Sequence, residues 1–114
     1  METTLIPFTR TYYRAKGYVY GLFWGDGEGS YPSTMVYSDT IEELRSRIRE
    51  GIMNGSLDSG MGFQRLIGAI MEITILKDII IDDKVYTNKT YETEFFGDLS
   101  EKQMEFLEGQ MLPM

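Results

Sequence analysis

The 114-residue chain contains no cysteine and no histidine, and only three prolines. Without cysteine there is no disulfide scaffold, no thiol nucleophile and no redox motif. Without histidine there is no Ser-His-Asp triad, no HExxH zinc site and no imidazole acid or base. The composition therefore excludes several common catalytic and metal-binding arrangements, and we expect no catalytic residue, no metal site and no cofactor.

Long hydrophobic segments are missing as well. No run of about 18 apolar residues exists, and residues 1–14 lack the charged-then-apolar pattern of a signal peptide. The sequence therefore predicts a cytoplasmic protein without membrane contacts. Since roughly 100–200 residues make one domain, we expect residues 1–114 to fold as a single domain around one core.

The charge is acidic overall but unevenly distributed. Eighteen acidic side chains against eleven basic ones give a net charge of −7, which argues against binding a nucleic-acid polymer through its phosphates. However, residues 1–49 are neutral, and the whole acidic excess lies in residues 50–114. The N-terminal half therefore carries no net charge that would repel a small anion.

The first regular segment, Thr11 to Trp24, is rich in aromatic residues and alternates between two kinds of side chain, as a long strand does. Its odd-numbered residues are mostly small or apolar, which favours packing under a helix. Glycines between Gly25 and Ser30 predict a tight reversal, and Tyr31 to Tyr37 the returning strand. The glycine-rich segment joins two strands and lacks a Gly-Lys-Ser/Thr ending, so it is not a phosphate-binding loop.

The clearest helix follows the second strand. Thr40 and Glu43 form a capping box, and Asn54 with Gly55 is a stop signal. Between these ends, four apolar residues recur at helical spacing on one face: Ile41, Leu44, Ile48 and Ile52.

The second half repeats the pattern of two strands and a helix. Residues 67–75 alternate as a strand whose β character continues to Ile81, and Asp82-Asp83 predicts a turn before a returning strand over 85–96. Ser100 and Gln103 predict the start of a last helix. The order β-β-α-β-β-α indicates an α+β fold, with an antiparallel sheet of about four strands and two helices on one side of it.

The even-numbered face of the first strand is the most informative feature. Aromatic rings alternate there with cations at spacings of about 7 Å. Rings stack on a planar base and cations hold phosphate oxygens, so this face suits a nucleotide-like anion. The alternative is that the rings are half-buried in the core or in a contact between subunits. The residues concerned are Arg10, Tyr12, Arg14, Lys16, Tyr18, Tyr20 and Trp24.

A second group of residues follows the small-residue loop from Ser56 to Gly62. Phe63 and Arg65 at the end of a mobile glycine loop could close over a planar anion, or Phe63 could simply anchor the loop to the core. The methionine-rich last helix is either an ordinary core helix or a surface that docks on another subunit. The predicted ligand-binding residues are Arg10, Arg14, Tyr18, Tyr20, Trp24, Phe63 and Arg65.

Parts of the sequence resemble a family of small phage-encoded proteins. Residues 11–13, 16–24 and the Gly-Asp-Gly-Glu-Gly-Ser-Tyr-Pro run at 25–32, together with residues 57–63, are similar to the Thoeris anti-defence sponge family, over about a third of the chain. The resemblance implies a non-enzymatic homo-oligomer in the host cytoplasm. It also implies capture of a cyclic ADP-ribose-type signal by stacking aromatics and arginines in pockets between subunits.

These observations favour a binding protein that sequesters a nucleotide-derived immune signal and so counteracts host defence. The net charge supports an alternative, an acidic protein that mimics DNA and inhibits a host nuclease or defence enzyme. A third hypothesis is an enzyme that uses only Asp, Glu, Tyr or Lys side chains, for example a nucleotide hydrolase. The expected partners are a small anionic ligand and further copies of the chain.

Overall fold

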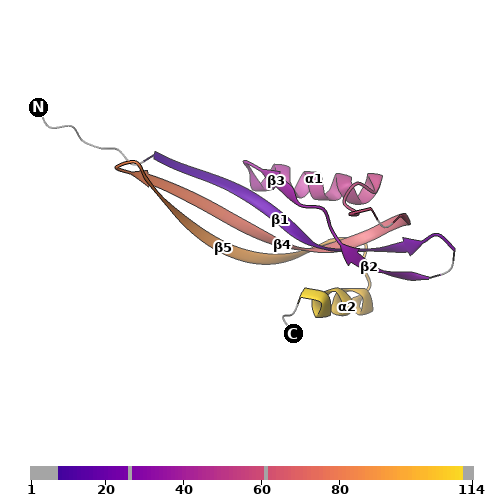
Figure 1. Ribbon diagram of the computed structural model, residues 1–114. Coiled ribbons are helices and arrows are strands. Elements are labelled where there is room, and N and C mark those ends of the chain that lie inside the picture. The colour runs from indigo at the N-terminus through magenta and orange to yellow at the C-terminus, as the bar shows by residue number, and fades with distance from the viewer. Residues whose placement is uncertain (1–7, 26, 61, 112–114) are drawn as a thin grey trace, which may run out of the picture.

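The computed structural model describes residues 8–25, 27–60 and 62–111, which form one antiparallel sheet with a helix on each face (Figure 1). The α+β class and the order of elements are confirmed, with the second strand divided in two. The elements are β1 (Phe8–Phe23), β2 (Glu28–Pro32), β3 (Val36–Ser38), α1 (Ile41–Asn54), β4 (Phe63–Ile81), β5 (Lys84–Gly97) and α2 (Glu101–Met111).

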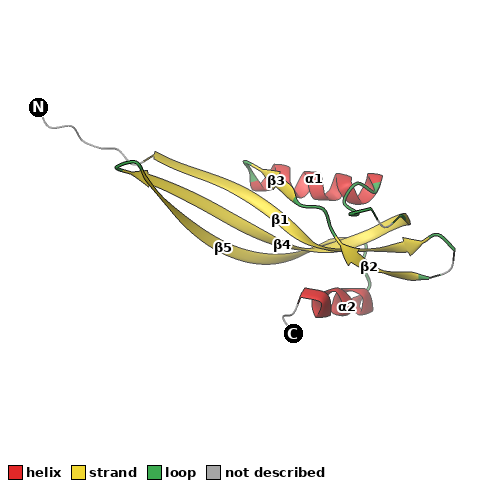
Figure 2. Cartoon of the chain, in the orientation of Figure 1, coloured by secondary structure: helices red, strands yellow, loops and turns green. Residues whose placement is uncertain are grey.

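The sheet has the strand order β2-β1-β4-β5, and β3 pairs with β1 beside β2. Its centre is the ladder between β1 and β4, which runs from Phe8 opposite Ile80 to Phe23 opposite Phe63. These strands are 16 and 19 residues long, so the molecule is elongated, with extents of 73 × 30 × 21 Å. One end of β1, β4 and β5 extends beyond both helices as a three-stranded arm (Figure 2).

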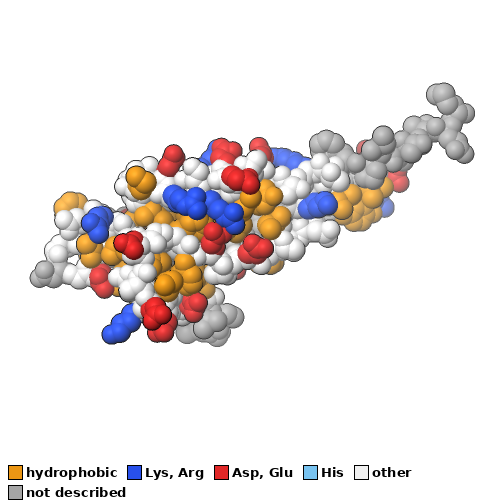
Figure 3. Space-filling model, turned by 180° about the vertical axis from the view of Figure 1, so that it is seen from behind, with side chains coloured by type: hydrophobic (Ala, Val, Ile, Leu, Met, Phe, Trp, Pro, Cys, Tyr) orange, Lys and Arg blue, Asp and Glu red, His pale blue; other side chains and the backbone are white. Residues whose placement is uncertain are grey.

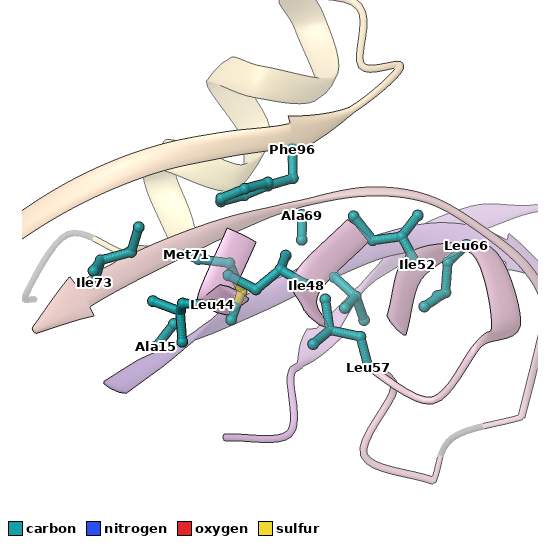
Figure 4. Close-up of a cluster of buried hydrophobic side chains, with 11 residues drawn as sticks. Ala15, Leu44, Ile48, Ile52, Leu57, Leu66, Ala69, Met71, Ile73 and Phe96 are labelled. Carbon is teal, nitrogen blue, oxygen red and sulfur yellow. The ribbon is translucent and has the colours of Figure 1, made fainter. Parts of the chain in front are cut away.

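The two helices lie on opposite faces of the sheet, so the expectation that both cover one side is wrong. On one face, Leu44 and Ile48 of α1 pack on Ala15, Met71 and their neighbours (Figure 4). On the other face, α2 packs through its buried Leu107. The physical reason lies in β4, whose side chains are apolar on both faces, because a strand with two apolar faces needs a cover on each.

Both helices begin as their sequences predict. The Thr40 hydroxyl accepts a hydrogen bond from the backbone N–H of Glu43 at 3.2 Å, and Gly55 ends α1 in the left-handed conformation with a φ of 80°. At α2 the capping box is reciprocal. The Ser100 N–H donates to Oε1 of Gln103 at 2.9 Å, and the Gln103 N–H donates to the Ser100 hydroxyl at 3.2 Å.

The returning strand is not continuous from 31 to 37, as the sequence predicts, but is split into β2 and β3. Ser33 between them donates its backbone N–H to the Gly17 carbonyl at 2.8 Å, but its hydroxyl, rather than a backbone carbonyl, accepts the hydrogen bond of the Gly17 N–H at 2.9 Å. The pairing shifts by one residue across this point, from Tyr18 opposite Pro32 to Ala15 opposite Val36. One extra residue therefore bulges out of the strand.

The two central strands are longer than predicted. β1 begins at Phe8 rather than Thr11, and β4 runs without a break from Phe63 to Ile81. The polar pair Lys77-Asp78 does not interrupt β4, because β1 pairs with these two residues on one side and β5 on the other. Neither helix covers the arm on which they lie (Figure 2), so polar side chains are tolerated there. Among the described residues, no helix is long and apolar enough to span a membrane.

The close approach of β1 and β4 makes Gly17 a critical position. A Cβ atom built there would collide with the backbone carbonyl of Ile70 on β4, and backbone in the centre of a sheet cannot move aside. We predict that Gly17→Ala lowers the free energy of unfolding by about 1–3 kcal/mol or more, as measured by chemical denaturation. The matched control is Gly109→Ala in α2, where a Cβ meets nothing within 4 Å. It should be neutral or stabilising by up to about 1 kcal/mol, and equal effects at both sites would contradict the steric argument.

Candidate functional site

Helix α2 divides the even-numbered face of β1 into a covered and an uncovered part. Tyr20 is buried under the helix with only 7% of its surface exposed, and Tyr18 packs beside it. The Tyr20 ring meets Phe106 edge to face at 6.0 Å between centroids, and its hydroxyl donates to Glu28 Oε1 at 2.8 Å. The Tyr20 ring is therefore occupied within the protein and has no face free for a ligand.

The surroundings of Tyr20 also raise its pKa. Burial is the largest cause, and the hydrogen bond to Glu28 and the negative charge of that carboxylate add to it. The effect is that Tyr20 stays a neutral hydrogen-bond donor to higher pH than a tyrosine in water. Its role is to join the tip of the β1–β2 hairpin to the layer under α2.

Phe63 and Trp24 lie far along the sheet from the uncovered part of β1. The Phe63 ring stacks on Phe23 with 4.8 Å between ring centroids and an interplanar angle of 13°. It also packs against the hydrophobic cluster between α1 and the sheet. The interpretation of Phe63 as an anchor for the loop is the one that the structure supports. Trp24 is 71% exposed just beyond β1, after two register shifts in the β1–β4 ladder. Trp24 lies twelve residues along the chain from Tyr12, which is roughly 40 Å of extended strand, so it is far from the uncovered part of β1.

Arg10 and Arg65, two of the predicted ligand-binding residues, lie at opposite ends of the β1–β4 ladder. Arg10 pairs in register with Asp78, and Arg65 pairs with Leu22, which separates them by roughly 40 Å along β4. Arg10 forms an exposed ion pair with Asp39 at 3.8 Å, and its guanidinium lies 5.0 Å from the Tyr12 ring centroid. The seven predicted ligand-binding residues therefore do not form one site.

The uncovered part of this face keeps cations and rings together. We call it the open face, and it is formed by three adjacent rows across β1, β4 and β5. Arg14, Lys16 and Lys89 form no ion pair with any described residue, while Thr74 and Leu76 between them are buried to 3% and 4% exposure. The three rows are Lys16–Glu72–Thr93, Arg14–Thr74–Tyr91 and Tyr12–Leu76–Lys89.

A hollow of about 340 Å³ adjoins the open face where α2 ends. Lys16, Tyr18 and Glu72 line it from the sheet, and Gln110 and Met111 line it from the helix. Its size falls near the lower end of the range for small-molecule sites. The hollow therefore combines an aromatic ring, a thioether, a carboxylate and the unpaired cation Lys16, and the unpaired Arg14 lies in the adjacent row of the open face.

Sequence reasoning missed the contribution of β5 to this face. Lys89 and Tyr91 alternate as expected within the predicted strand over 85–96. Which β1 residues share a row with them, however, depends on the registers of the β1–β4 and β4–β5 ladders. Alternation gives the face of a strand, whereas only pairing gives the residue opposite. No signal in the sequence alone placed Tyr91 in the same row as Arg14, with Thr74 of β4 between them.

The carboxylates of the described residues are dispersed rather than arranged as an array. Glu94 holds Arg45 through two contacts of 3.1 and 3.2 Å, Glu43 pairs with Arg47, and no group of three acidic side chains that could hold a metal is found among the described positions. On the face that Figure 3 shows, acidic side chains are interspersed with basic and apolar ones. This pattern gives the DNA-mimic alternative no support.

Comparison with protein-family models, with curated proteins and with solved structures finds no match to this chain. The resemblance to the anti-defence sponge family therefore stays a prediction, as do the enzyme and inhibitor hypotheses.

We predict that Tyr20→Phe lowers the free energy of unfolding by about 1 kcal/mol at neutral pH, because it removes the hydrogen bond to Glu28. The raised pKa of Tyr20 also stabilises the fold below about pH 10, the ordinary tyrosine pKa, and this contribution is lost as the pH rises through the raised value.

Denaturation curves between about pH 8 and 12 should therefore show a smaller alkaline loss of stability in Tyr20→Phe than in the wild type. Tyr37→Phe, at an exposed position, is the control. Its free energy of unfolding should match that of the wild type both at neutral pH and across the alkaline range. A parallel alkaline loss in wild type and Tyr20→Phe would contradict the assignment.

Proposed function

We propose that the protein is a non-catalytic binding protein for a small, planar, nucleotide-like anion. The observation that carries the proposal is the position of the unpaired cations Arg14 and Lys16 beside Tyr18 and a hollow of about 340 Å³. Cations without carboxylate partners on an acidic protein keep their charge available for an anion.

The chemistry of the site divides between its two parts. Arg14 and Lys16 would hold phosphate oxygens by charge-assisted hydrogen bonds, which are the stronger kind. The hollow would take the planar base between Tyr18 and Met111, where stacking on an aromatic ring contributes about 1–3 kcal/mol. The Glu72 carboxylate at the same hollow can accept a hydrogen bond from an amino group of the base.

The biological role that we propose is sequestration of such a signal without cleavage. Support comes from two sources: the open face lies outside the helices on a rigid sheet, and the chain has neither histidine nor cysteine to act as a base or nucleophile. The link to a cyclic ADP-ribose-type signal and to phage counter-defence rests on the resemblance of residues 11–13, 16–32 and 57–63 alone.

We predict that Arg14→Ala weakens binding of an adenine-containing phosphate ligand by about tenfold or more, because it removes a charge-assisted contact. Isothermal titration calorimetry with ADP-ribose, cyclic ADP-ribose and AMP would measure this. Arg65→Ala is the matched control, because it removes the same charge at a site nine residues, or roughly 30 Å, along β4 from Thr74, the residue opposite Arg14, and it should leave the affinity within about twofold.

Two results would overturn the proposal. One is no measurable heat with any of these ligands at high micromolar concentrations, and the other is an equal loss of affinity in Arg14→Ala and Arg65→Ala. Recovery of the ligand after incubation separates binding from catalysis: intact ligand supports sequestration, and a cleaved product would show an enzyme.

A further inference from the structure

The outer edge of the sheet is formed by a long strand that no proline or bulge interrupts. β5 is 14 residues long, and within the described part of the chain no strand pairs with its outer edge. It contains no proline, and its ladder with β4 has no register shift. Natural proteins interrupt such edges with prolines, bulges or short strands because an open edge is a template for pairing with another chain.

The side chains of β5 also remain uncovered on the arm. Every residue from 84 to 93 is exposed, including Val85, Tyr86 and Tyr91 at 60%, 53% and 58%. Figure 2 shows that neither helix reaches this part of the sheet. A long edge with regular pairing and large exposed apolar side chains indicates a strand that pairs with a partner.

We infer that the partner is a second copy of the chain, paired antiparallel along β5, with Asn88 of one copy opposite Asn88 of the other. A two-fold axis through this pair fixes every other contact. Lys84 then faces Glu92, Val85 faces Tyr91, and Tyr86 faces Thr90, and each pair occurs twice. Opposite charges and aromatic side chains facing β-branched ones are the pairs that stabilise antiparallel strands.

Neighbouring registers lack this complementarity. Moving the axis to Lys89 places two lysines directly opposite each other and directs Lys84 at Glu94, which Arg45 already holds. Moving it to Thr87 leaves no pair of opposite charges between the exposed parts of the two strands. Since like charges directly opposite are destabilising and opposite charges are stabilising, the sequence of β5 favours the register centred on Asn88 over these two neighbours.

The pairing would join two sheets into one and bring their open faces together at the seam. Val85, Thr87, Lys89 and Tyr91 lie on the same side of β5 as the open face, so Lys89 and Tyr91 of both copies would share one continuous surface. The dimer does not depend on a ligand, and its test is therefore separate from that of the binding function.

The absence of native cysteine makes the register directly testable. We predict that Asn88→Cys forms a disulfide-linked dimer under mild oxidation, because directly opposed residues on antiparallel strands lie within the Cα separations that a disulfide bridges. Thr90→Cys on the same face is the matched control. In this register its two copies are offset by four residues, or roughly 13 Å, and they should not crosslink.

A charge exchange tests the same contact without a covalent bond. Lys84→Glu and Glu92→Lys each oppose like charges at both ends, so each variant alone should raise the dimer dissociation constant by roughly tenfold in sedimentation equilibrium. An equimolar mixture restores an opposite-charge pair at both ends, and it should bring the constant back to within about twofold of the wild type. Lys102→Glu on α2 makes the same charge change away from the edge and should have no effect.

Several outcomes would overturn the inference. These are a monomeric wild type at all concentrations up to about millimolar, equal crosslinking of Asn88→Cys and Thr90→Cys, or a mixture of the charge variants that stays dissociated. A wild-type dimer that neither charge variant weakens would place the contact on another surface. A monomer that pairs only with a different protein would assign the edge to another partner.

Discussion

The antiparallel ladder between β1 and β4 is the constraint on which the rest of the structure depends. It runs over the whole described length of β1, and its close backbone approach at Gly17 leaves no room for a side chain between the strands. Every other element is placed relative to it: β2 and β3 extend it on one side, β5 on the other, and each helix covers one of its faces. Because side chains alternate along a strand, this one ladder sorts the chain into two layers.

The ladder is longer than the helices that cover it, and this mismatch creates the surfaces available for binding. A helix rises about 1.5 Å per residue, whereas a strand rises about 3.3 Å, so the 14 residues of α1 and 11 of α2 span much less than the 19 of β4. The uncovered remainder is the arm. Its open face and the outer edge of β5 are consequences of the same difference in length.

The tyrosines show how one sequence pattern acquires two roles. Tyr12, Tyr18 and Tyr20 are equivalent in the alternation of β1, but α2 crosses the sheet above the last two. Tyr20 is therefore a buried hydrogen-bond donor to Glu28, Tyr18 lines the hollow at the end of the helix, and Tyr12 lies beside Arg10 on the arm. Position relative to the helix, rather than residue type, separates core residues from surface residues.

The local elements follow from the sequence alone, because their signals act within a few residues. The cap at Thr40, the stop at Gly55, the capping box at Ser100 and the alternation of β1 all predicted what the structure contains. Those signals were sufficient for the fold class, for the order of elements and for the face of β1 that α1 covers. They were also sufficient to find Arg14 as a candidate site residue.

How these elements combine depends on tertiary contacts. The side of the sheet that α2 covers, the split of the returning strand at Ser33 and the distance between Arg10 and Arg65 all depend on pairings between residues distant in sequence. The same holds for the row that Arg14 and Tyr91 share across Thr74. Alternation along one strand specifies a face but not a neighbour, and a neighbour is fixed only when the strands lock in register.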